Sequence, residues 1–83
     1  MPVTVTFYTR KRCHLCDVAR EIVDDVREEV DFALEVFDID ADEALRARFH
    51  TDVPVVCVNG EPRFKHRLTH PALADAVRAA TAP

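Results

Sequence analysis

Two cysteines, Cys13 and Cys16, are the residues of this chain whose type and spacing best suit chemistry. His14 and Leu15 separate them, and a basic run at positions 10–12 precedes them. A free cysteine titrates near about 8.5, whereas a thiol at a helix start with cationic neighbours can titrate at roughly 3.5–7.5. The pattern predicts that Cys13 is a nucleophile and that Cys16 resolves its mixed disulfide.

The flanking sequence places this pair between a strand and a helix. Residues 3–8 alternate in polarity and are β-branched or aromatic, which is typical of a strand. The apolar residues that follow recur at the spacing of one helical face as far as position 30, and they are Leu15, Val18, Ala19, Ile22, Val23, Val26 and Val30. A helix start offers free N–H groups and a partial positive charge, and both favour a thiolate.

The remaining elements complete one small α/β domain over residues 1–83. Strands are expected over 33–39, 53–58 and 63–68, with helices from Asp40 or Asp42 to about His50 and from a Thr69 cap to about Ala80. Asn59-Gly60 predicts a tight hairpin between the last two strands. The order β-α-β-α-β-β-α is that of the minimal thioredoxin fold, a four-stranded mixed sheet with helices on both faces. In that fold a cis proline opens the third strand opposite the cysteines, and Pro54 stands at that place.

The composition of the chain argues against several classes of function. The chain has 83 residues, 48% hydrophobic and 31% charged, with a net charge of −4. An acidic chain is a poor partner for nucleic acid, and no stretch has transmembrane length or the form of a signal peptide. Three cysteines are too few, and odd in number, for a disulfide-stapled secreted scaffold. A cytoplasmic protein that binds neither nucleic acid nor membranes is expected.

At several motifs the chain resembles the glutaredoxin family, and within it a short bacterial glutaredoxin-like branch. The motifs are Tyr8-Thr9 leading into Cys13-His14-Leu15-Cys16-Asp17, then residues 37–42, Val53-Pro54-Val55-Val56 and Asn59-Gly60. The resemblance implies that Arg10 takes the place of a lysine that meets a glutathione carboxylate. It also implies that the backbone of Val53, before Pro54, pairs with the cysteinyl part of the ligand.

Three features depart from the family pattern. His14-Leu15 stands where glutaredoxins typically have Pro-Tyr, and Asp52 stands where threonine is common. Residues 67–70 replace the Gly-Gly-Asp type turn that holds the γ-glutamyl end of glutathione. The ligand is therefore less well defined by the sequence than the disulfide chemistry is.

Several residues keep two interpretations. His14 either favours the thiolate as an imidazolium or faces solvent, and Tyr8 either contacts substrate or packs at a strand end. Cys57, on an apolar strand, is interpreted as a buried core residue. A closed zinc site needs about four ligands, and a single C-x-x-C does not supply them, so no metal site is predicted.

The expected function is thiol–disulfide oxidoreductase of dithiol glutaredoxin-like type. Cys13 and Cys16 are the predicted catalytic residues, and the predicted substrate contacts are Tyr8, Arg10, His14, Leu15, Val53 and Pro54. No tightly bound cofactor is expected. Glutathione or another low-molecular-weight thiol, or a reductase, would regenerate a monomer that acts on protein or small-thiol disulfides. The alternatives are a non-catalytic binding module of the same fold and, third, an iron–sulfur or metal carrier.

Overall fold

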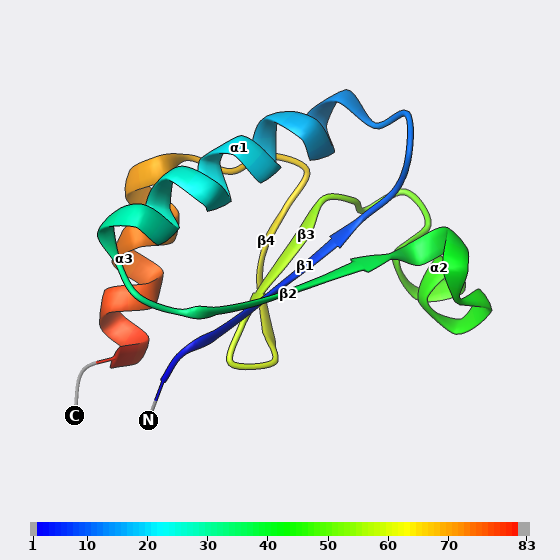
Figure 1. Cartoon of the computed structure of the whole chain (residues 1–83). Helices are drawn as coiled ribbons and strands as arrows, with labels where there is room; N and C mark the ends of the chain where they lie inside the picture. The colour runs from blue at the N-terminus through cyan, green and yellow to red at the C-terminus, as the bar shows by residue number, and fades with distance from the viewer. Residues whose placement is uncertain (1, 82–83) are drawn as a thin grey trace.

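A computed structural model describes residues 2–81, which form four strands and three α-helices with one short 3-10 helix (Figure 1). In chain order the elements are β1 (Thr4–Thr9), α1 (His14–Glu29), β2 (Ala33–Asp38), η1 (Ile39–Ala41), α2 (Glu43–Phe49), β3 (Val55–Val58), β4 (Glu61–Lys65) and α3 (His70–Thr81).

The strands form one mixed sheet in the order β2-β1-β3-β4. β1 runs parallel to β2, with Phe7 opposite Val36, and antiparallel to β3, with Phe7 opposite Val56. β3 and β4 form the antiparallel hairpin. A parallel neighbour requires a crossover, which α1 provides between β1 and β2. The predicted element order and mixed sheet are confirmed.

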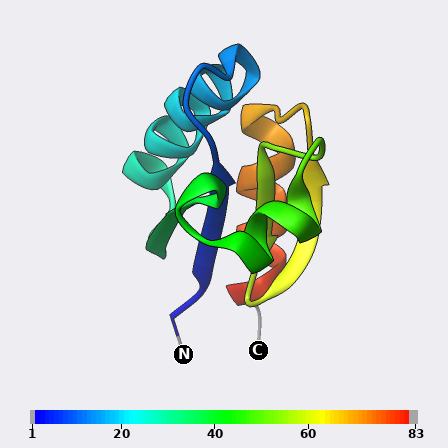
Figure 2. The same ribbon diagram turned by 90° about the vertical axis from the view of Figure 1, so that its right-hand side faces the viewer.

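Alternation along the strands sends side chains to two different cores. Val5, Phe7 and Val56 face α1 and α3, where they join the larger hydrophobic cluster. Tyr8 and Val55 point to the opposite face, where η1 and α2 cover the sheet. In Figure 2, α2 lies in the foreground of the strands and α3 behind them. The loop from β1 to α1 and the segment from α2 to β3 meet at one end of the sheet (Figure 1), which is where the cysteines lie.

The predicted helix α1 is present, and one residue expected on its buried face is exposed. Ala19, Val23 and Val26 are buried as their spacing predicts, and the helix ends at Glu29, with Val30 as its C-cap. Val18 was expected on the same buried face, but it is 41% exposed. Val36 of the edge strand β2 is equally exposed, at 41%.

The predicted local signals at turns and caps are present. Asn59 and Gly60 both adopt positive φ, 51° and 83°, as a two-residue hairpin of this handedness requires. The Asp42 carboxylate accepts hydrogen bonds from the first N–H groups of α2, and Thr69 Oγ1 accepts one from Ala72 at 3.3 Å. These side chains satisfy N–H groups that would otherwise lack partners.

The strand limits differ from the predicted ones. β4 was expected over 63–68 but occupies Glu61–Lys65, because the tight turn lets Glu61 pair directly with Val58 and His66 then leaves the ladder with a φ of 67°. β3 begins at Val55 instead of residue 53, after Pro54. β2 ends at Asp38 because its carboxylate accepts a hydrogen bond from Asp40 N, which starts η1, a turn the sequence analysis missed.

Candidate active site

Cys13 is the N-cap of α1, and its sulfur takes the place of the usual capping oxygen. Its backbone is extended (φ −117°, ψ 101°), and Cys16 N donates a hydrogen bond to Cys13 Sγ at 3.1 Å. Asp17 N bonds to the Cys13 carbonyl at 3.1 Å, which closes the first helical turn. The preceding Arg12 has a φ of 58°, a left-handed turn that few non-glycine residues adopt. This turn directs the chain from β1 into α1 and places Cys13 at the N-cap of the helix.

The structure holds Cys13 and Cys16 as a disulfide, with a Cα–Cα distance of 5.1 Å. The two sulfurs differ in accessibility: Cys13 is half-buried, whereas Cys16 is only 1% exposed. A reagent from solution therefore reaches Cys13 first. The order of attack predicted from the sequence stays a prediction, and this asymmetry is compatible with it.

Pro54 lies in the same region, and the Val53–Pro54 peptide bond is cis, an isomer that the sequence alone left open. Val53 and Cys16 belong to one hydrophobic cluster, against which Cys13 also packs. Two hydrogen bonds from His66 hold this loop. His66 N donates to the Pro54 carbonyl at 2.9 Å, and the His66 ring Nε2 lies 2.9 Å from the Thr51 carbonyl. The loop before β3 is thus fixed beside the cysteines.

Tyr8 packs against two aromatic rings. It stacks on Phe49 at a centroid distance of 4.4 Å and on Phe37 at 5.7 Å. Of the two interpretations left open by the sequence, these contacts support packing: the ring joins β1 to α2 and β2.

Arg10 has protein partners that the sequence did not indicate. Its Nη2 and Nε lie 2.7 and 3.1 Å from the two carboxylate oxygens of Asp40, and its Nη1 donates to the His50 carbonyl at 2.8 Å. The guanidinium therefore ties the β1–α1 loop to η1 and to the end of α2. The predicted contact of Arg10 with a ligand carboxylate stays a prediction. The same guanidinium N–H groups already donate hydrogen bonds within the protein.

His14 and Leu15 are both exposed in the first turn of α1. Leu15 is 37% exposed and Val18, one turn later on the same helix face, is 41% exposed. They form a small apolar surface beside Cys13. Leu15 is one of the predicted substrate contacts, which stay predictions, whereas Val18 was expected to be buried.

Cys57 is a buried core residue, 4% exposed, in the cluster that contains Cys16. Burial raises the pKa of the Cys57 thiol above its ordinary value of 9.0, and the positive charge of Arg48 offsets part of this rise. Its environment thus favours the protonated thiol.

Two absences concern the part of the chain that the structure describes. Within residues 2–81, no group of three or more Cys, His, Asp or Glu side chains is arranged to hold a metal ion. In the same range, none of the helices is both long enough and apolar enough to cross a membrane.

Known proteins share both this fold and parts of this sequence. Residues 4–78 match the family described as "Glutaredoxin-like domain (DUF836)". A "Glutaredoxin-like protein YDR286C homolog" of Dictyostelium discoideum is 35% identical over 72 residues, covering 80% of this chain and 67% of that protein.

Two solved structures illustrate the structural similarity. The structural genomics target protein XcR50 from X. campestris is 32% identical, with a TM-score of 0.76, and the match covers 95% of this chain and 99% of that one. A mutant thioredoxin from Halobacterium salinarum is 22% identical, with a TM-score of 0.77 over 98% of this chain and 76% of that one.

The mixed sheet, the helix-start cysteine pair and the neighbouring cis proline define a thioredoxin-fold protein with a redox-type dithiol pair. Within that class, the chain belongs to the glutaredoxin-like domain family, and the resemblance drawn from its motifs is confirmed.

Proposed function

We propose that this protein is a dithiol thiol–disulfide oxidoreductase in which Cys13 is the nucleophile and Cys16 the resolving thiol. The observation that carries the proposal is the unequal exposure of two bonded sulfurs at one helix start, Cys13 half-buried and Cys16 buried. A pair that only stabilised the fold would not need its first sulfur at the surface beside a cis proline.

The reaction begins with the reduced pair. The Cys13 thiolate attacks one sulfur of a substrate disulfide; a new S–S bond forms, the substrate bond breaks, and the leaving thiolate takes a proton from solvent. Cys16, deprotonated, then attacks Cys13 Sγ and releases the second substrate thiol. Two electrons pass from the protein dithiol to the substrate, and the product is the Cys13–Cys16 disulfide seen in the structure.

The surroundings of Cys13 support the first step. The free N–H groups and partial positive charge of the α1 N-terminus favour a thiolate at the N-cap. Cys16 N already donates to Cys13 Sγ. Lys11 and Arg12 are exposed next to the pair and add positive charge. Cys16 is held within one helical turn, which suits rapid intramolecular resolution.

The proposed regeneration uses two equivalents of a low-molecular-weight thiol, such as glutathione, or one turnover of a dithiol reductase. The proposed substrates are disulfides of proteins or small thiols. Comparing glutathione with a thioredoxin-reductase system as electron donor, at equal substrate, distinguishes the two routes.

The decisive experiment follows reduction of a mixed-disulfide peptide by the wild type, Cys13→Ser, Cys16→Ser and, as a matched control, Cys57→Ala. We expect turnover by the wild type and Cys57→Ala, and none above background by Cys13→Ser. Cys16→Ser should accumulate a covalent adduct detectable by mass spectrometry. Wild-type turnover no greater than that of Cys13→Ser would refute the proposal and favour a non-catalytic binding module.

A further inference from the structure

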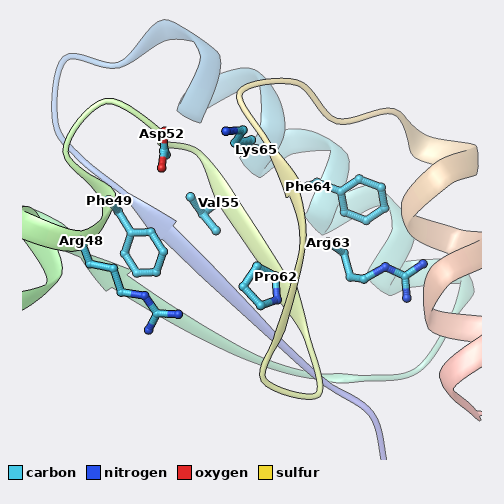
Figure 3. A pocket seen from close by; sticks show the side chains of 8 residues that line it. All are labelled: Arg48, Phe49, Asp52, Val55, Pro62, Arg63, Phe64 and Lys65. Atoms are coloured by element: carbon cyan, nitrogen blue, oxygen red, sulfur yellow. The ribbon is translucent and has the colours of Figure 1, made fainter.

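A cavity of about 430 Å³ opens between α2 and β4, on the face of the sheet opposite α1 (Figure 3). Phe49, Val55 and Pro62 give it an apolar floor. The volume is within the usual range of small-ligand sites. The motifs identified in the sequence include only Val55 and the adjoining Asp52 of this cavity, because its walls come from four separate segments.

The cavity wall is basic although the molecule is acidic. Arg48, Arg63 and Lys65 line it together with one carboxylate, Asp52. Because the Arg63 side chain extends away from the floor (Figure 3), the charges at the cavity are two positive, Arg48 and Lys65, against one negative, whereas the whole chain carries −4. Among the ion pairs within residues 2–81, none involves these three cations. Cations that make no ion pair are complementary to an anion.

Two of the cations stand at opposite ends of the apolar floor. In Figure 3, Lys65 lies beside Asp52 at one end and Arg48 beside Phe49 at the other, whereas the Arg63 side chain extends to the far side of β4. The Arg48 guanidinium is 4.8 Å from the centroid of the Phe49 ring, a cation–π contact that limits its positions. The cavity thus has an apolar floor between two positively charged side chains.

The cavity adjoins the cysteine site. Phe49 and Val55 belong to the cluster that contains Cys16, and Cys13 packs against that cluster. Asp52 directly precedes the cis Val53–Pro54 bond. A ligand chain that places its disulfide at Cys13 can therefore continue along the proline loop toward the cavity.

The cavity is also bordered by an open sheet edge. β4 is the last strand in the order β2-β1-β3-β4 and pairs with β3 alone among the described strands. An edge strand can receive an extended peptide through backbone hydrogen bonds, while pockets for side chains supply specificity. A small anion could bind to the positively charged side chains, but it could not pair with the backbone of the edge strand β4.

We propose that this cavity binds an extended acidic segment with an apolar side chain, contributed by the protein whose disulfide reacts at Cys13. The proposal rests on the proposed oxidoreductase function and adds its substrate class. The apolar side chain occupies the floor, and flanking carboxylates meet Arg48 and Lys65.

The test uses two peptides, each with one cysteine disulfide-linked to a chromogenic thiol and followed by either a Glu-Leu-Glu or a Gln-Leu-Gln segment. With dithiothreitol as reductant, we expect the wild type to favour the acidic peptide in kcat/KM. Arg48→Gln and Lys65→Gln should each lower that preference roughly two- to fivefold, the range of partly exposed charge pairs. Arg27→Gln, an exposed cation at the end of α1, is the matched control and should retain it.

A second measurement does not depend on turnover: binding of the acidic peptide without its cysteine to the oxidised protein, followed by amide chemical shifts. Shifts confined to α2 and β4, weakened by both cavity variants but not by Arg27→Gln, support the proposal. Turnover of both peptides at equal kcat/KM, with no such shifts, overturns it and leaves the oxidoreductase function intact. Competition by free glutamate as strong as by the peptide would show a small-anion site and also overturn it. If neither peptide is reduced, the proposed function fails and the shifts alone decide whether the cavity binds acidic peptide.

Discussion

At the scale of single residues, burial distinguishes the three thiols by their accessibility to solvent. Cys13 reaches the surface at a helix N-terminus, Cys16 is buried within bonding distance of it, and Cys57 is buried on the adjoining strand without a sulfur partner. Cys16 and Cys57 share one hydrophobic cluster, so apolar surroundings alone do not make a thiol reactive. The helix start supplies the difference, because it offers positive potential and N–H groups to Cys13 and none to Cys57.

Cys57 gives the fold a dependence on alkaline pH. Burial raises its pKa in the folded state above the ordinary value of 9.0, and Arg48 reduces this rise. Between the unfolded and folded pKa values the folded protein binds more protons than the unfolded one. The resulting stabilisation is fully present below the unfolded pKa and is lost as pH rises through the folded pKa.

We therefore expect the free energy of unfolding to fall more steeply above about pH 9 when Cys57 is present. The measurement is urea unfolding from pH 7 to pH 10.5 in a Cys13→Ser, Cys16→Ser background, where Cys57 is the remaining cysteine. The control adds Cys57→Ala, which should be less stable at pH 7 because of the lost packing but flatter in the alkaline range. Parallel pH profiles for the two proteins would contradict the raised pKa.

At the scale of elements, the sequence predicted features that depend on near neighbours. The α1 periodicity, the Asn59-Gly60 turn and the Asp42 and Thr69 caps each lie within a few residues of the groups they satisfy. Features that depend on distant partners were not predictable. Arg10 could be assigned to a ligand because nothing nearby in sequence indicates that Asp40, thirty residues away, holds it.

In the candidate site, too, some features were predictable from the sequence and others were not. Cys13, Cys16 and Pro54 were predictable because the motif and the fold place them together. The α2–β4 cavity was not, because Arg48, Asp52, Val55 and Lys65 meet through tertiary packing and share no pattern in the sequence. The exposure of Val18 was also not predictable, because helical periodicity does not show which apolar residues the neighbouring elements cover.

Arg10 provides a test of the link between β1, η1 and α2. A lysine can keep one contact, but not the paired bonds to both Asp40 oxygens and the third bond to the His50 carbonyl. We expect Arg10→Lys to lower the free energy of unfolding by about 1 kcal/mol, since the pair is partly solvent-screened. Denaturant unfolding measures this, and Arg12→Lys, which removes no such bonds, is the control. An Arg10→Lys variant of unchanged stability with a raised KM would instead indicate that Arg10 serves the ligand.

At the scale of the whole molecule, the two faces of the sheet carry unequal cores. Among residues 2–81, fourteen buried residues form the cluster under α1 and α3, whereas six form the cluster under η1 and α2. α2 contributes one buried residue, Phe49, and its other side chains are exposed or half-buried. Elements with few buried apolar contacts open locally at lower free energy than the core does. The smaller cluster is also the one that borders the cysteines and the basic cavity, so we expect the side of the sheet with the candidate site to be less firmly held.

This arrangement predicts that α2 opens without the rest of the fold. In native-state hydrogen exchange of the oxidised protein, amides of α2 should exchange at a lower free energy of opening than those at Val23 and Val26 of α1. Val23→Ala, at a fully buried position of the other cluster, should lower the free energy of opening of the slowest α1 amides by about 2 kcal/mol and leave α2 unchanged, because local opening of α2 does not break the Val23 contacts. Leu45→Ala should accelerate exchange in α2 and also that of the slowest α1 amides, because global unfolding breaks the Leu45 contacts as well. Because Arg10 ties α2 to the cysteine loop, Arg10→Lys should follow the pattern of Leu45→Ala. Acceleration of α2 by Val23→Ala as large as that of α1 would show one cooperative unit and refute the prediction.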